Sequence, residues 1–284
     1  MTGSKVMALT GLDQNKPTVT NVLTGINGQI NTPITTDGTY LYFGTWPGGS
    51  NAGTYYQVKL SDYSVKTFTP DSYGFYWAGA VSDGTNVYFG SDNGLLYWRS
   101  IADFDTTGGV LDLTDVASDA GNVRSTVMLD DGYLYFTTQG GYLWCCSYDD
   151  GLTVEWHKKL GATSTSTPTK VGDRIYVGYY SGFNAGGVQC VSADGSSVKT
   201  VVEGDGFPVQ SSIVVMGDGT GTDYLYFNTN AQKGVGYCYS YDGTTGSQVW
   251  GTTGDTYALG GMAIDNGYAV FGNDYNHLYV VHDC

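Results

Sequence analysis

The chain has 284 residues, of which 41% are hydrophobic, and its 27 acidic against 12 basic residues give a net charge of −15. This balance argues against nucleic acid and anionic membranes as partners, because almost every basic residue would have to cluster to offset it. No apolar run reaches the roughly 18 residues of a membrane span, so we expect no membrane insertion. Many Gly and Tyr residues with few Lys and Glu are typical of an all-β secreted or cell-surface protein.

A short pattern made of a turn, an apolar strand and a glycine recurs along the chain. Its clearest copy is residues 83–90, Asp-Gly-Thr-Asn-Val-Tyr-Phe-Gly, in which Asp-Gly predicts a turn before a buried strand. The other copies begin at residues 37, 131, 172, 223 and 266. Spacings of roughly 45 residues lie in the range for the blades of a β-propeller.

Each repeat predicts four antiparallel strands. The first two strands of the first repeat are expected at residues 32–36 and 40–44. The third strands are expected at residues 54–60, 95–101, 142–148, 187–193, 236–241 and 278–282. The fourth strands are expected at residues 64–69, 110–113, 154–158, 198–202 and 248–251, and the sixth repeat ends without one. No segment keeps a period of 3.6 over ten residues, so no helix longer than a turn is predicted.

The missing last strand is matched by a spare strand at residues 18–23, before the first repeat. Pairing the two would remove two open sheet edges. We therefore expect one domain over residues 1–284, an all-β six-bladed β-propeller of four-stranded antiparallel blades, closed by the N-terminal strand. Seven blades are the alternative, in which residues 1–30 would have to supply most of a blade.

An aspartate ends the third strand of every repeat, and we interpret this column as structural. Its side chain can accept hydrogen bonds from the amides of the turn that follows. The six residues are Asp62, Asp103, Asp149, Asp194, Asp242 and Asp283.

The repeat resembles the PQQ-like repeat of quinoprotein-type β-propellers, and its four-stranded architecture is also WD40-like. The Thr-Pro opening occurs at residues 32–33 and 167–168, and the best match to the closing motif is residues 241–250, Tyr-Asp-Gly-Thr-Thr-Gly-Ser-Gln-Val-Trp. The likeness covers nearly the whole chain and implies a fold rather than a chemistry. The closing tryptophan is missing from the first, second and fourth repeats, so the family's tryptophan pattern is only partly present.

Adjacent Cys145 and Cys146 suggest one catalytic alternative, because quinoprotein alcohol dehydrogenases stack their quinone on a disulfide between neighbouring cysteines. Here the pair lies in a predicted strand, where neighbouring side chains point to opposite faces. Cys145 also shares a column with Cys190 and Cys238, four residues before the aligned aspartate. Cysteine often behaves as a small buried hydrophobe, so we interpret this column as packing.

No cofactor or metal site is predicted. The acidic turn at residues 218–223 lacks the ligand spacing of an EF-hand, and the three histidines, His157, His277 and His282, belong to different repeats. The family's calcium ligands and catalytic aspartate match no motif in this chain, so an oxidoreductase function remains only an alternative.

Aromatic and polar residues in the loops at one end of the repeats are the remaining candidates for function. Loops on a rigid scaffold commonly carry binding sites, and rigid aromatic rings suit a sugar, a peptide or a small organic ligand. The alternative is that these rings pack between blades. The candidates are Trp46, Tyr76, Trp77, Arg124, Tyr180, Gln210, Tyr257 and Tyr275.

The sequence therefore predicts a non-catalytic binding module that recognises a protein, glycan or small molecule at this aromatic-lined end. We expect a monomeric domain of a larger protein at the cell surface or outside the cell. The alternatives are a quinoprotein-like oxidoreductase and a structural scaffold for protein assembly.

Overall fold

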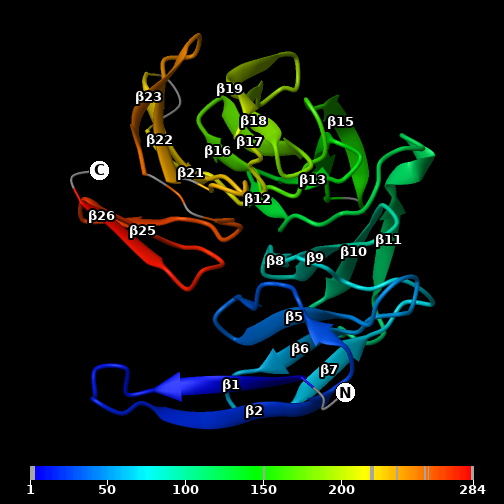
Figure 1. The fold of residues 1–284 in the computed structure, drawn as a ribbon. Coiled ribbons are helices and arrows are strands. Elements are labelled where there is room, and N and C mark those ends of the chain that lie inside the picture. Colours follow the sequence, from blue (N-terminus) through cyan, green and yellow to red (C-terminus); the bar gives the residue numbers. More distant parts are fainter. Residues whose placement is uncertain are drawn as a thin grey trace. The chain divides into compact units, whose positions relative to one another are not determined.

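The computed structural model describes residues 4–149, 151–217, 221–234, 236–252, 254 and 256–282. The chain divides into two compact units, Met1–Asp112 and Leu113–Cys284. Within each unit the strands form antiparallel sheets, and apart from β3 and β4 neighbours along the chain are neighbours in the sheet, as the consecutive colours of Figure 1 show. The prediction of a single domain over residues 1–284 stays a prediction.

The first unit contains a hairpin and two larger sheets. The hairpin pairs β1 (Ser4–Thr10) with β2 (Thr18–Ile26). The next sheet contains β3 (Gln29–Ile30), β4 (Thr35–Thr36), β5 (Tyr40–Trp46), β6 (Tyr55–Lys59) and β7 (Val65–Phe68), with β3 and β4 both paired to β5. The third sheet contains β8 (Val81–Ser82), β9 (Asn86–Ser91), β10 (Leu95–Ser100) and β11 (Gly108–Asp112).

The second unit opens with the short 3-10 helix η1 (Leu113–Asp115), followed by four sheets. The first sheet contains β12 (Met128–Asp130), β13 (Tyr133–Thr138), β14 (Tyr142–Ser147) and β15 (Thr153–Lys159). The second sheet contains β16 (Thr169–Val171), β17 (Arg174–Ser181), β18 (Ala185–Ser192) and β19 (Val198–Asp205). The third sheet contains β20 (Val214–Met216), β21 (Asp223–Asn228), β22 (Gly236–Tyr241) and β23 (Gly246–Gly251). The fourth sheet contains β24 (Ala263–Asp265), β25 (Tyr268–Gly272) and β26 (Leu278–His282).

The predicted four-stranded repeat is confirmed, and most strand bounds differ from the prediction by one or two residues. The largest difference is in the first repeat, where only β4 lies within the expected strand at residues 32–36 and a separate short strand, β3, precedes it. Within the described residues the last sheet has three strands, and β2, the predicted closing strand, is paired with β1. The closed six-bladed ring therefore stays a prediction.

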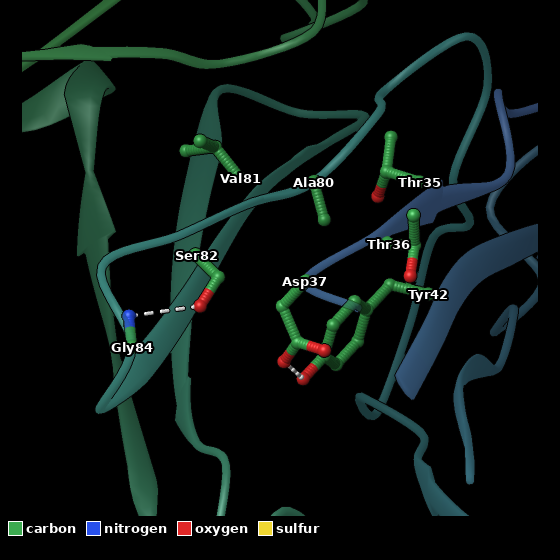
Figure 2. Close-up of a pocket in the computed structure, with 8 residues that line it drawn as sticks. All are labelled: Thr35, Thr36, Asp37, Tyr42, Ala80, Val81, Ser82 and Gly84. Carbon is green, nitrogen blue, oxygen red and sulfur yellow. Dashed lines mark hydrogen bonds between the residues drawn. The ribbon is translucent and has the colours of Figure 1, made fainter. Parts of the chain in front are cut away.

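The turn between β4 and β5 explains why Asp, Gly and Tyr recur together (Figure 2). Asp37 Oδ1 accepts the amides of Thr39 and Tyr40 at 2.8 and 2.7 Å, and Tyr42 Oη donates to Asp37 Oδ2 at 2.7 Å. Gly38 between them has φ +89°, which favours glycine. The residues that hold the turn thus come at fixed spacings in the sequence.

The turn between β8 and β9 repeats this geometry. Asp83 Oδ1 accepts two amides at 2.7 Å, Gly84 has φ +91°, and Tyr88 Oη donates to Asp83 Oδ2 at 2.7 Å. The aspartate column after the third strands is likewise structural at three described positions, where Asp62, Asp194 and Asp242 accept turn amides. Asp283 lies outside the described residues.

The cysteine column is part of the core, as predicted. Cys145, Cys190 and Cys238 are each opposite a tyrosine of the preceding strand and are no more than 6% exposed. Each belongs to a different hydrophobic cluster, so the column repeats one packing position from sheet to sheet.

Candidate functional site

Three of the predicted ligand-binding residues come together in the first unit. Trp46 ends β5, and Tyr76 and Trp77 lie in the loop between β7 and β8. The Trp46 and Tyr76 rings are 5.0 Å apart at 72°, and the Tyr76 and Trp77 rings are 4.7 Å apart at 48°. All three side chains are partly exposed. We call these three residues the aromatic cluster.

The loop backbone that carries the cluster is fixed by hydrogen bonds to the neighbouring strand and loop. Phe75 N donates to Thr45 O at 3.0 Å, and Gly53 N donates to Tyr73 O at 2.8 Å. A Cβ on Gly74 would lie 3.0 Å from Pro47 Cδ, so this residue packs closely against the loop after β5. The rings therefore sit on a well-connected loop pair rather than on a free segment.

Sequence reasoning missed Asp92, which lies beneath the cluster. Its side chain accepts a hydrogen bond from Trp46 Nε1 at 3.3 Å, and its amide donates to Gly74 O at 3.1 Å. Asp92 is only 5% exposed. The Asp-Asn-Gly turn signal at this position gave no hint that the aspartate would bond to a tryptophan 46 residues earlier.

The backbone at Trp77 is unusual for a bulky residue. Its φ is +60°, in the left-handed region that few side chains larger than Asn adopt. Tyr73, in the same loop, has φ +63°. Phe75 between them is fully buried against Tyr55 and Phe89, so it belongs to the core and not to the exposed cluster.

The other five predicted residues lie in the second unit. Tyr257 contacts Phe183 edge to face, with ring centroids 5.3 Å apart, and its carbonyl accepts the amide of Asp274 at 3.0 Å. Tyr275 is 63% exposed and Phe183 55%. These three aromatic residues lie in loops contributed by three different sheets.

The remaining three predicted residues are spread along the second unit. Gln210 is only 7% exposed, and its carbonyl accepts the Thr165 hydroxyl at 3.2 Å. Tyr180 lies in β17 and is partly exposed, and Arg124 follows Val123, which bridges to Thr138. The ligand-binding role of these three residues stays a prediction.

Cys145 and Cys146, the basis of the oxidoreductase alternative, are free and buried in β14. Burial raises the pKa of Cys145 to about 11 and raises the pKa of Cys146 further. Both thiols therefore stay protonated at neutral pH, which disfavours nucleophilic or redox chemistry.

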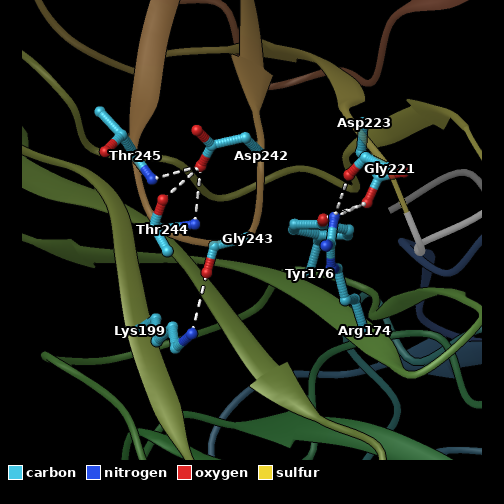
Figure 3. A network of polar contacts seen from close by, with 9 residues as sticks. All are labelled: Arg174, Tyr176, Lys199, Gly221, Asp223, Asp242, Gly243, Thr244 and Thr245. Carbon is cyan, nitrogen blue, oxygen red and sulfur yellow. Dashed lines mark hydrogen bonds and ion pairs between the residues drawn. The ribbon is translucent and has the colours of Figure 1, made fainter.

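A polar network joins two neighbouring sheets of the second unit (Figure 3). Arg174 Nη1 donates to Asp223 Oδ2 at 2.9 Å and to Gly221 O at 2.8 Å, and Tyr176 Oη donates to the same Asp223 oxygen. The Asp223 side chain is fully buried and that of Arg174 is 17% exposed. The position that matches Asp37 and Asp83 is Val171 in this sheet, and Tyr176 donates to Asp223 of the next sheet.

The described residues offer neither a metal-ligand cluster nor a membrane-spanning helix. They contain no group of three or more His, Cys, Asp or Glu side chains placed to hold a metal ion. In the same part of the chain, no helix is long and apolar enough to cross a membrane.

Comparisons with known proteins identify the fold. No protein-family model matches the chain, and no curated protein sequence matches it significantly. A chain of the Mitotic Checkpoint Complex is similar in structure over 99% of this chain and 84% of its own, with a TM-score of 0.68 and 11% identity. Sqt1 from Saccharomyces cerevisiae is similar in structure over 98% of this chain and 78% of its own, with a TM-score of 0.68 and 12% identity.

BamB from Moraxella catarrhalis is similar over 89% of this chain and 85% of its own, with a TM-score of 0.51 and 12% identity. These neighbours include PQQ-like and WD40 propellers. At such low identity they carry the fold alone. Together with the repeated antiparallel sheets, they show that the chain has the β-propeller fold, in agreement with the resemblance seen in its repeats.

Proposed function

We propose that this protein is a non-catalytic binding module that recognises a protein partner through the aromatic cluster of Trp46, Tyr76 and Trp77. The observation that carries the proposal is the left-handed backbone of Trp77, with φ +60°. Such a conformation costs on the order of 1–3 kcal/mol in a residue other than glycine. Glycine would adopt it freely, so a tryptophan here favours a role for the ring itself.

The shape of the cluster supports a large partner. Its rings are held against one another and remain partly exposed, which gives a preordered surface with an apolar body and polar edges. Tryptophan and tyrosine in this setting are typical of protein-binding hot spots. The second unit carries exposed Phe183 and Tyr275 in its own loops. One structural neighbour is a chain of the Mitotic Checkpoint Complex, which supports a protein as the partner.

The test compares Trp77→Gly with Tyr63→Gly. Tyr63 also has a left-handed backbone, φ +57°, and is 40% exposed, but it lies in the β6–β7 turn, at the opposite end of β6 from the cluster. Both variants relieve backbone strain and delete one ring. Proteins from the source organism that are captured by the wild type should be captured by Tyr63→Gly and lost with Trp77→Gly.

Equal capture by both variants would contradict the proposed site. A glycan array and a metabolite screen with the same proteins distinguish the other ligand classes. Saturable binding of a glycan or metabolite that requires Trp77, without any captured protein, would replace the proposed partner class.

We also infer that the ring has six blades and closes by pairing β2 with β26. β26 is an edge strand of its sheet in the described residues, and Leu278 and Val280 on it are 70% and 59% exposed. An unpaired edge of this kind invites another strand. Deleting residues 1–26 should then speed amide hydrogen exchange in β26, whereas unchanged exchange there would contradict this closure.

We propose a location outside the cell or at its surface, as the composition suggests. Antibody detection of the protein in secreted, surface and cytosolic fractions of the source organism tests this location. Detection confined to the cytosolic fraction would contradict this location without affecting the binding proposal.

A further inference from the structure

A cavity of about 330 Å³ lies in the first unit between the edge strands β4 and β8 (Figure 2). It is at the Asp37 end of β5, whereas Trp46 and the aromatic cluster are at the other end of that strand. Its volume is at the small end of the range for small-molecule sites. The cavity is thus distinct from the proposed protein-binding site.

One wall of the cavity contains a buried hydroxyl with unused hydrogen-bonding capacity. Thr35 Oγ1 is buried and has no hydrogen-bond partner among the described residues. The neighbouring Thr36 hydroxyl, by contrast, donates to Tyr40 O at 2.8 Å and accepts the Gly38 amide at 3.0 Å. A buried hydroxyl without a partner costs about 1–3 kcal/mol. A ligand that bonds to Thr35 would recover part of that cost.

Two further polar groups line the same cavity. Ser82 Oγ accepts the Gly84 amide at 2.9 Å, which leaves its own proton for a ligand acceptor. Asp37 accepts three hydrogen bonds, one from Tyr42 and two from turn amides, and an ionised carboxylate has about four acceptor positions. Burial raises the pKa of Asp37, but these hydrogen bonds outweigh it and hold the pKa below its usual value. The carboxylate is therefore ionised at neutral pH.

The lining excludes anions and favours hydroxyl groups. No lining residue is cationic and Asp37 is negative, so a phosphate or carboxylate would be repelled. Thr35 and Ser82 can each donate, and Asp37 only accepts, so a ligand group that both donates and accepts fits all three. Ala80 and Val81 supply an apolar wall for a carbon skeleton.

We propose that this cavity binds a small neutral polyol of monosaccharide size, hydrogen-bonded to Thr35, Asp37 and Ser82. Ligand hydroxyls donate to the free acceptor position of Asp37 and exchange hydrogen bonds with the Thr35 and Ser82 hydroxyls. The ring or chain carbons of the polyol lie against Ala80 and Val81. The Asp37 charge is already shared by three donors, which favours a neutral ligand over an ammonium group.

The test is saturation-transfer NMR with the full chain and four probes, D-glucose, D-galactose, D-mannose and myo-inositol. At least one should bind saturably, and Thr35→Val should weaken it by about tenfold or more, as expected for the loss of a buried hydrogen bond. Thr35→Val keeps the branched shape and removes an unpartnered hydroxyl, so its melting temperature should equal or exceed that of the wild type.

Ser211→Ala is the matched control, because Ser211 Oγ is also buried without a partner but lies in the second unit. It should leave polyol binding unchanged. The proposal is overturned if none of the four probes binds saturably, or if Thr35→Val binds as tightly as Ser211→Ala. Binding of methylammonium chloride in place of the polyols would overturn the neutral ligand class.

Discussion

Asp223→Ala should destabilise the second unit more than the loss of one hydrogen bond would suggest. The fully buried Asp223 carboxylate accepts from Arg174 at 2.9 Å and from Tyr176. Its removal leaves the Tyr176 hydroxyl buried without this acceptor and leaves Arg174 with only Gly221 O from this network. Breaking a buried ion pair from one side costs about 3–5 kcal/mol, a large part of the roughly 5–15 kcal/mol that keeps a domain folded.

The comparison variant is Asp37→Ala. Asp37 accepts from Tyr42 and from two turn amides but is exposed, so water can replace part of these bonds and we expect a loss nearer to 1–2 kcal/mol. Urea unfolding followed by tryptophan fluorescence and circular dichroism gives both free energies by linear extrapolation. Trp144, Trp156 and Trp250 report on the second unit.

A second substitution makes the test sharper, because its effect should change sign. Tyr176→Phe in the wild type should cost about 1 kcal/mol, since it removes a satisfied hydrogen bond. In the Asp223→Ala background the same change should recover about 1 kcal/mol or more, since it removes a buried hydroxyl that has lost its acceptor. A smaller loss for Asp223→Ala than for Asp37→Ala, or no change of sign, would refute this account of the network.

Three further predictions concern acid stability, the thiols and close packing. The Ser192 hydroxyl and a turn amide lower the pKa of Asp194 to about 2, and the Thr244 hydroxyl and turn amides do the same for Asp242. Because the unfolded pKa is about 3.9, the contribution of these two carboxylates to stability is present above pH 4 and is lost as the pH falls toward 2. The melting temperature of Asp194→Asn/Asp242→Asn should therefore fall less steeply in this window, and a parallel fall would contradict it. Cys145 and Cys146 should resist iodoacetamide at neutral pH until urea unfolds the chain, and native labelling would contradict their burial. Gly44→Ala should lower the free energy of unfolding by about 1–3 kcal/mol, because its Cβ would lie 2.5 Å from Phe75 Cβ. Gly260→Ala has open space around it and should change this free energy little, so equal losses in the two variants would contradict the packing.

The fold was largely predictable because the residues that build it recur at fixed spacings. Asp83, Gly84 and Tyr88 each have a separate task in one turn, and Asp37, Gly38 and Tyr42 repeat it, so the pattern marks turns before buried strands. The cysteine column was predictable for the same reason, since each member meets a tyrosine of the preceding strand at the same register.

The candidate site was predictable only in part. The choice of Trp46, Tyr76 and Trp77 followed from loops rich in aromatic residues, but Phe75, next to Tyr76 in the same loop, is fully buried. Loop aromatics alternate between core and surface with no period that a sequence displays. Asp92 could not be found in advance, because its significance is a hydrogen bond to Trp46, which lies in another sheet. Thr35 could not be found either, because its significance is a buried hydroxyl without a partner among the described residues, which depends on the neighbouring strands.

The most direct test of the proposed binding surface is the hydrogen-exchange footprint of a captured partner on the full chain. Our account predicts slower exchange on binding in the loop after β5 and in the loop between β7 and β8, which together carry Trp46, Tyr76 and Trp77. It predicts no change in the β6–β7 turn around Tyr63. Protection confined to that turn, or protection that leaves both cluster loops unchanged, would contradict the assignment of the aromatic cluster as the recognition site.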